Sequence, residues 1–305
     1  FSLGQGVSSP ESMVEAAAAR GYSALACTDT NGVYGAVEFQ QAAVARGITP
    51  ILGAHLVHGG QEAVALATDD RGWAALCRAI TAIHWVGCHP EERSDKGSLK
   101  VCTRRDSSVA SLPRNDKTLS LSSILATDRD GLLILSQDIA FLEDLVRLSG
   151  PRDVYAELRP GKERHAVGSA ARRLGIPAAV TGGVMFAHPE DWPRHRLRVA
   201  IHRNSTLSAV GNELTIDDCR LTIGTNPSIV DRQSAIGNHQ SSIVNLSPRD
   251  AWLRPGSDLT RHFPDCPEAL TRTMELAERC SYRIPIGIRV VAPRFADADD
   301  AFLRL

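Results

Sequence analysis

The sequence lacks long apolar runs and any excess of charge of one sign. No stretch of the 305 residues approaches the roughly 20 apolar residues that cross a bilayer, and no hydrophobic signal segment opens the chain. The 34 lysines and arginines are balanced by 35 aspartates and glutamates, which leaves a formal charge of -1. Free-standing nucleic-acid binders are normally basic, so any DNA contact should be local or made by another part of a larger protein. These absences predict a cytoplasmic protein with no membrane partner.

The cysteines lack any pattern: they are scattered, with no C-x-x-C pair anywhere in the sequence. An odd number of scattered thiols in a chain of this size is typical of reduced cysteines in the cytoplasm. We therefore expect neither disulfides nor a zinc knuckle. The seven cysteines are Cys27, Cys77, Cys88, Cys102, Cys219, Cys266 and Cys280.

What the sequence does contain is an alternation of short apolar segments with amphipathic helical segments. Strands are expected at 23–28, 50–57, 62–67, 131–136, 154–158 and 178–181, and most are followed by a segment of helical period. This order predicts an α/β fold with a mostly parallel sheet or barrel. In such folds the chemistry lies at the carboxyl ends of the strands. The positions there are Asp29, Thr30, Ala54, His55 and residues 182–185.

Two segments break this order. Residues 88–117 are polar, rich in Ser and Arg, and without period, which predicts a flexible insert. Residues 214–248 divide into five sevens, but only one strong apolar position recurs in each, so they cannot form a coiled coil. We interpret them as a second flexible insert from a tandem repeat; irregular β turns on the rim of the fold are the alternative. The remainder of 1–295 is then one domain, and 296–305 begins a linker.

Five stretches, in order, carry a family resemblance. They are 22–39 with Thr28-Asp29-Thr30, 47–55, 71–78, 176–191 and 263–280. Together they resemble the N-terminal polymerase and histidinol phosphatase (PHP) domain of the bacterial DNA polymerase III alpha subunit and of its error-prone relatives. The resemblance implies a distorted (β/α)7 barrel, in agreement with the alternation of strands and helices.

In active members of that family, His, Asp and Glu side chains at the strand ends hold metal ions that hydrolyse phosphate esters. Carried over to this sequence, the opening His-x-His motif would fall before Phe1, which is not a Met and suggests a piece of a longer protein. Asp29 is kept, but Thr30 replaces the following His. His55 stands where the family has Glu, and Glu62 aligns with a His.

Both ligands of the late Asp-x-His motif are replaced, by Gly183 and Met185. Glycine has no donor atom, and a thioether is a poor ligand for Zn, Mn or Mg. The resemblance therefore implies a degenerate metal site, of which Asp29, His55 and Glu62 are the remnants. No cofactor is expected, and a single divalent ion on these three residues is the alternative.

Each remnant also has a structural interpretation. Asp29 suits a turn or helix cap that accepts backbone N–H groups. His55 would be a packed or rim histidine, Glu62 an exposed loop carboxylate, and His188 a residue at a helix start. The arginines of 194–203, flanked by histidines, are expected to form a solvated helix face rather than a phosphate site.

Other catalytic signatures are missing: there is no G-x-x-x-x-G-K-[ST] phosphate loop and no G-x-S-x-G elbow. The resemblance implies the PHP region of a DNA-directed DNA polymerase acting in replication or translesion synthesis, with a scaffolding role. Its expected partners are the polymerase core, a proofreading exonuclease, and DNA through the parent enzyme. The palm would lie past Leu305, so this chain alone should not polymerise DNA. The alternatives are a stand-alone metal-dependent phosphoesterase and a non-functional fragment of an interrupted gene.

Overall fold

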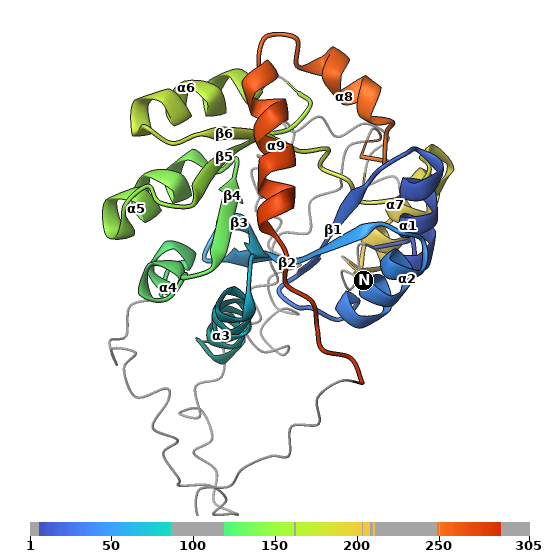
Figure 1. The fold of residues 1–305 in the computed structure, drawn as a ribbon, viewed down its shortest axis with the longest axis horizontal. Coiled ribbons are helices and arrows are strands. Elements are labelled where there is room, and N and C mark those ends of the chain that lie inside the picture. The colour runs from blue at the N-terminus through green and yellow to red at the C-terminus, as the bar shows by residue number, and fades with distance from the viewer. Residues whose placement is uncertain are drawn as a thin grey trace, which may run out of the picture.

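The computed structural model describes residues 6–86, 119–161, 163–202, 204–207, 210, 249 and 251–287 (Figure 1). The predicted inserts at 88–117 and 214–248 and the predicted linker at 296–305 lie outside these residues. The division of 1–295 into one domain with two inserts therefore stays a prediction.

A six-stranded sheet forms the centre, and its strands lie side by side in chain order. They are β1 (Ala24–Thr30), β2 (Thr49–His58), β3 (Gln61–Ala67), β4 (Leu132–Ser136), β5 (Val154–Leu158) and β6 (Ala178–Val180). Only β3 runs against the others, because Gly59 and Gly60 form a two-residue turn with positive φ at both positions. The first residues of β3 consequently lie at the edge where the other strands end. All six predicted strands are confirmed.

The helices lie on either side of this sheet, and several of them begin at a residue whose side chain caps them. Ser9 accepts a hydrogen bond from the N–H of Ser12, and Asp138 from that of Phe141. Two short helices, α4 and α8, were not predicted. The helices are α1 (Pro10–Ala19), α2 (Ala36–Ala45), α3 (Asp70–Val86), α4 (Leu121–Thr127), α5 (Ile139–Ser149), α6 (Arg164–Leu174), the 3-10 turn η2 (Pro189–Asp191), α7 (Trp192–His202), α8 (Gly256–His262) and α9 (Pro267–Arg279).

Different helices pack against the two faces of the sheet. The outer face, with residues such as Ala54 and Ile134, packs against α3 to α6, while α1 and α2 pack over β1 and β2. On the inner face, Ile51, Leu133 and Tyr155 form an apolar cluster with residues of α9. Figure 1 shows α9 crossing in front of the sheet. The inner face is therefore buried in its middle by a single helix.

Helix α9 also covers the exposed edge of β6. The hydroxyl of Thr273 donates to the carbonyl of Val180 (2.7 Å) and accepts from its N–H (3.0 Å). Arg272 donates to the carbonyl of Ala178 at 3.3 Å. These contacts satisfy backbone groups that an edge strand would otherwise leave open for pairing with another chain.

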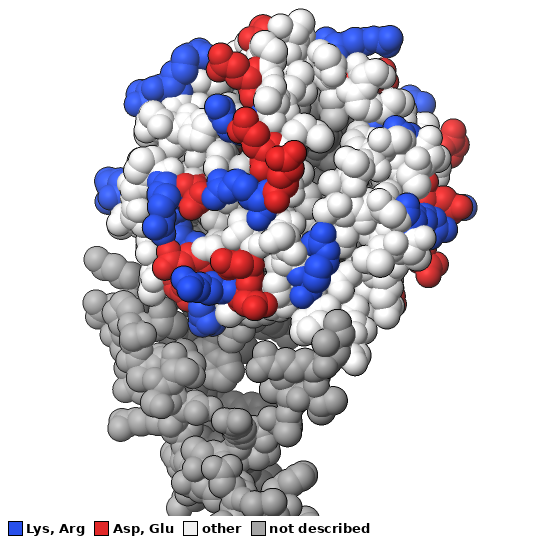
Figure 2. Space-filling model, in the orientation of Figure 1, with Lys and Arg blue, Asp and Glu red and all other residues white. Residues whose placement is uncertain are grey.

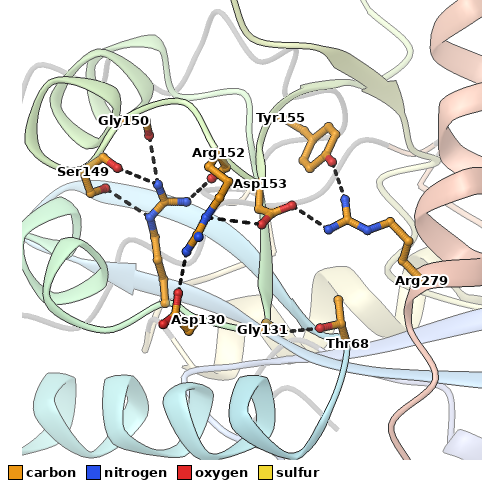
Figure 3. A network of polar contacts seen from close by, with 10 residues as sticks. Thr68, Asp130, Gly131, Ser149, Gly150, Arg152, Asp153, Tyr155 and Arg279 are labelled. Carbon is orange, nitrogen blue, oxygen red and sulfur yellow. Dashed lines mark hydrogen bonds and ion pairs between the residues drawn. The ribbon is translucent and has the colours of Figure 1, made fainter.

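The far end of α9 is held by a polar network at the edge where β4 and β5 begin (Figure 3). Arg279 donates to Asp153 (2.6 Å) and to the hydroxyl of Tyr155 (2.7 Å). The hydrogen bond with Asp153 is the main reason why the pKa of Arg279 is raised. The helix is thus fixed at its middle and at its carboxyl end, and these contacts set its path over the inner face.

Within the described residues, β1 and β6 do not pair with each other. An isolated bridge between Phe186 and Trp252 brings the segment after β6 against residues 251–254 instead. The predicted α/β fold of distorted-barrel type is confirmed, with six strands described and a hairpin in place of one crossover helix.

Candidate functional site

His55 and Glu62 lie together on the inner face, at the edge where the parallel strands end. Val57 of β2 pairs with Glu62 of β3, so His55, two residues earlier, is the diagonal neighbour of Glu62 on the same face. Nε2 of His55 lies 3.5 Å from Oε2 of Glu62. The prediction that Glu62 lies in an exposed loop was wrong. The Gly59-Gly60 turn is so tight that Glu62 is already the second residue of β3 and is half-buried.

Asp29, the third predicted residue, does not join this pair. Asp29 is 3% exposed, and its carboxylate accepts a hydrogen bond of 2.8 Å from the N–H of Gly35, just before α2. In β1 it pairs with Ala54, which points to the outer face, whereas Thr30 pairs with His55. Burial and the nearby Asp29 carboxylate raise the pKa of Cys27 to about 12. Asp29 thus orders the turn into α2, as its interpretation as a turn residue expects.

Three residues that the sequence analysis did not select lie at the same strand ends as His55 and Glu62. Glu157, near the end of β5, has a side chain only 5% exposed. Its two oxygens accept hydrogen bonds from Thr181 (2.6 Å) and from Arg159 (2.8 Å). The available signal was a glutamate inside the apolar run Val154–Leu158, followed two residues later by an arginine. We call His55, Glu62, Glu157, Arg159 and Thr181 the strand-end cluster.

Gly183 makes room for the arginine of this cluster. Its φ is +57°, and a Cβ at this position would lie 3.1 Å from Cδ of Arg159. A side chain at 183 would therefore be strained by its backbone and would press on the Arg159 stem. The position at which the family resemblance expects an aspartate ligand is thus next to the arginine.

The charges of the cluster stabilise one another. The pKa of Glu62 is lowered to about 2, and the largest cause is its contact with the His55 ring. Burial acts in the opposite direction and raises this pKa, whereas Arg159 and Gln137 lower it further. Burial opposes the charged form of Arg159, yet its pKa is raised because Glu157, Glu62 and Glu163 outweigh that effect. The cluster therefore holds carboxylates around a permanently charged guanidinium.

This donor set does not fit the metal centre that the family resemblance implies. No group of three or more His, Cys, Asp or Glu side chains in the described part of the chain is arranged to hold a metal ion. Glu157 is engaged by Arg159, whose fixed positive charge would repel a divalent cation placed beside it. We derive no metal-dependent step from these residues.

Glu62 should make the stability of the protein depend on acid. Because its folded pKa lies below its ordinary value of 4.5, its contribution is present above that value and is lost as pH falls toward about 2. Since 37% of its side chain is exposed, solvent screening limits the contribution to on the order of 1 kcal/mol. Urea unfolding of the wild type and of Glu62→Gln from neutral to acid pH measures it.

The stability difference between these two proteins should shrink by more than half between about pH 7 and pH 3. A stability difference that stays constant over this range would show that the neighbours of Glu62 do not stabilise its charged carboxylate.

The histidines in and before α7 that the sequence analysis considered do not form a functional cluster with one another. His188 precedes η2, where its N–H donates to Asp191 at 3.3 Å. His195 is not on a solvated face: it is fully buried, and its ring packs against those of Phe186 and Trp192, with centroids at 5.6 and 5.9 Å. His202 is exposed at the end of the helix.

Among the described residues, no helix is both long and apolar enough to cross a membrane.

Curated relatives resemble almost the whole chain. Proteins named "Error-prone DNA polymerase" are 29% identical over 324 residues in Symbiobacterium thermophilum and 29% over 321 residues in Mycobacterium tuberculosis (strain H37Rv). The one from Mycolicibacterium paratuberculosis is 30% identical over 319 residues. Each match covers 98% of this chain, but only 26%, 25% and 25% of the relative. The chain thus spans about a quarter of the length of these relatives.

Among solved structures, an amidohydrolase from Chromobacterium violaceum with bound sulfate and no metal aligns with a TM-score of 0.36. It is 17% identical, and the alignment covers 58% of this chain and 82% of that one. This similarity is too low to support a conclusion about activity. The model of the family described as "PHP domain", by contrast, matches residues 1–158, which is more than half of the 305 residues and includes β1 to β5. The chain therefore belongs to the PHP domain family.

Proposed function

We propose that this chain is the PHP region of a larger DNA-directed DNA polymerase of the polymerase III alpha type, and that its role there is structural. The names of its relatives and the quarter of their length that it spans support the parent enzyme. Polymerase chemistry needs palm carboxylates that bind two metal ions, and these would come from the rest of such a protein. The reading frame of the gene past Leu305 tests this part: it should encode palm and fingers regions.

The observation that carries the structural role is the guanidinium of Arg159 among the carboxylates of the strand-end cluster. It donates to Glu157 at 2.8 Å and acts on Glu62 through charge, so the cluster already contains its own cation. A phosphoesterase centre would need open coordination positions on a bound metal. We propose that the cluster instead holds β2, β3, β5 and the segment after β6 together, and that the domain packs against the polymerase core. Binding of a proofreading exonuclease stays a prediction.

A metal titration separates this role from that of a stand-alone phosphoesterase. We expect the purified chain to hydrolyse no p-nitrophenyl phosphate with added Zn, Mn or Mg, and its melting temperature to be the same with these ions and with a chelator. Metal-dependent turnover that disappears in Glu62→Gln, with Glu190→Gln as an exposed control, would overturn the proposal.

A further inference from the structure

The chain continues from α9 as a strap, residues 281–287, which contacts α3 and the start of β2. The ring of Tyr282 stacks on that of Trp73, with the two centroids 5.1 Å apart. Arg283 donates to the carbonyl of Pro50 at 2.8 Å. Figure 1 shows the strap in red, leaving the lower end of α9. Its path is therefore set by specific contacts with elements far away in the sequence.

Gln40 of α2 holds the strap as a neighbouring strand would. Its side-chain amide donates to the carbonyl of Ile284 and accepts from the N–H of the same residue, both at 2.8 Å. Directly beyond this contact the chain turns: the N–H of Ile286 donates to the carbonyl of Ile284 at 2.8 Å, around Pro285. Gly287 then adopts a φ of +70°. The strap is thus turned beside α2 at the point where the described residues end.

Three exposed aliphatic side chains lie around this contact. Val37 and Val44 are one turn before and one turn after Gln40 on the same side of α2, and they are 44% and 62% exposed. Ile286, on the strap itself, is 37% exposed. We call Val37, Val44 and Ile286 the exit patch. Since valine is a poorer helix former than glutamine or glutamate, the stability of α2 alone does not explain two valines at solvent-facing positions.

The surroundings of the exit patch carry few charges. In Figure 2 charged side chains crowd the surface over α9 and to its left, whereas few lie at the lower right, where Figure 1 places α2. Aliphatic side chains that are grouped on a surface mark a contact with another segment or molecule more often than single ones do.

The residues that come directly after the strap have the composition and the length to cover this patch. They are Ile288, Arg289, Val290 and Val291, three of which are aliphatic. The helix rises about 10 Å between the two valines of the patch, and an extended segment of four residues spans about 13 Å. The single charge of the segment is positive, and the exposed residue next to Val37 on α2 is a glutamate.

We propose that residues 288–291 dock on the exit patch along α2, so that the chain leaves the domain from this face. The proposal uses neither the strand-end cluster nor the proposed function. In the parent enzyme proposed above, it would make α2 the place from which the path to the polymerase core begins.

The test compares the melting temperatures of the whole chain and of a chain that ends at Gly287, each with and without Val37→Gln/Val44→Gln. In the whole chain the double substitution should lower the melting temperature by about 2–4 °C, because the segment loses its apolar contacts. In the shortened chain it should leave the melting temperature unchanged or raise it slightly, since glutamine is the better helix former. An equal change in both chains would overturn the proposal.

Trypsin provides a second measurement on the whole chain. Cleavage after Arg289, inside the docked segment, should be several-fold slower in the wild type than in Val37→Gln/Val44→Gln. Cleavage after Arg294, outside the segment, should proceed alike in both proteins. This comparison decides the question if the shortened chain does not fold, and cleavage after Arg289 at the same rate in both proteins counts against docking.

The matched control is Leu148→Gln on α5, where the leucine is 47% exposed. Its effect on the melting temperature should be the same in the whole and in the shortened chain, and a dependence on residues 288–305 as large as that of the valine variant overturns the proposal. Size-exclusion chromatography identifies another occupant. If the wild type is a dimer and Val37→Gln/Val44→Gln a monomer, the exit patch binds a second copy of the chain and the proposal is wrong.

Discussion

Replacement of Arg159 by Met is expected to destabilise the protein by about 3–5 kcal/mol. Its partner Glu157 is 5% exposed, so the variant leaves a buried carboxylate whose remaining hydrogen bond comes from Thr181. The methionine keeps the apolar stem that packs beside Gly183, and the loss therefore reports the guanidinium. Urea unfolding of the wild type and of Arg159→Met at neutral pH measures the difference in the free energy of unfolding.

A double-mutant cycle assigns this loss to the pair. Glu157→Gln retains a group that can accept from Thr181, and Arg159→Met/Glu157→Gln should be clearly more stable than Arg159→Met alone, because no unpaired charge stays buried. The exposed pair of Arg147 and Asp144 is the control, since Arg147→Met should cost at most about 1 kcal/mol. A cost for Arg159→Met no larger than this control would show that the pair is not what holds the strand ends together.

Much of the fold could be predicted because a buried strand is recognisable from a short run of consecutive apolar residues. All five residues of β5 are buried, and the apolar run 154–158 predicted its bounds without error. The turn role of Asp29 could be foreseen as well, since a short carboxylate between a strand and a helix commonly accepts backbone N–H groups. These features depend on a few neighbouring residues, so they can be recognised in the sequence without knowledge of the tertiary fold.

The strand-end cluster could not be predicted in the same way. Glu62 and Arg159 are almost 100 positions apart, and only the pairing of β3 with β4 and of β4 with β5 brings them to one face. The same holds for α9, whose helical period was evident but whose place over the inner face depends on Arg279 and Thr273. Helix α4 has only seven residues, too few to display a period.

Replacement of Arg129 by Met is the second change with a large expected effect, about 3 kcal/mol. Arg129 is 8% exposed, and its Nη2 donates to the carbonyls of Ser149 and Gly150, both at 2.9 Å, at the end of α5. Nη1 donates to the carbonyl of Arg152 (Figure 3). Burial and the neighbouring Arg152 lower the pKa of Arg129, whereas Asp153 and Asp130 raise it. The carbonyls of Ser149 and Gly150 lie at the negative end of the α5 helix dipole, where a cation is stabilising. The variant removes a cation and leaves three carbonyls without their donor.

Arg152 provides the matched control, because it is an arginine of the same network with a 73% exposed side chain, paired with the equally exposed Asp130. Arg152→Met should change the melting temperature little, whereas Arg129→Met should lower it by several degrees. Arg129→Lys separates charge from geometry, since an ammonium keeps the positive charge but cannot direct donors in the plane of a guanidinium. If Arg129→Lys is as stable as the wild type, charge alone stabilises the end of α5; a loss close to that of Arg129→Met assigns the stability to the fixed directions of the guanidinium donors.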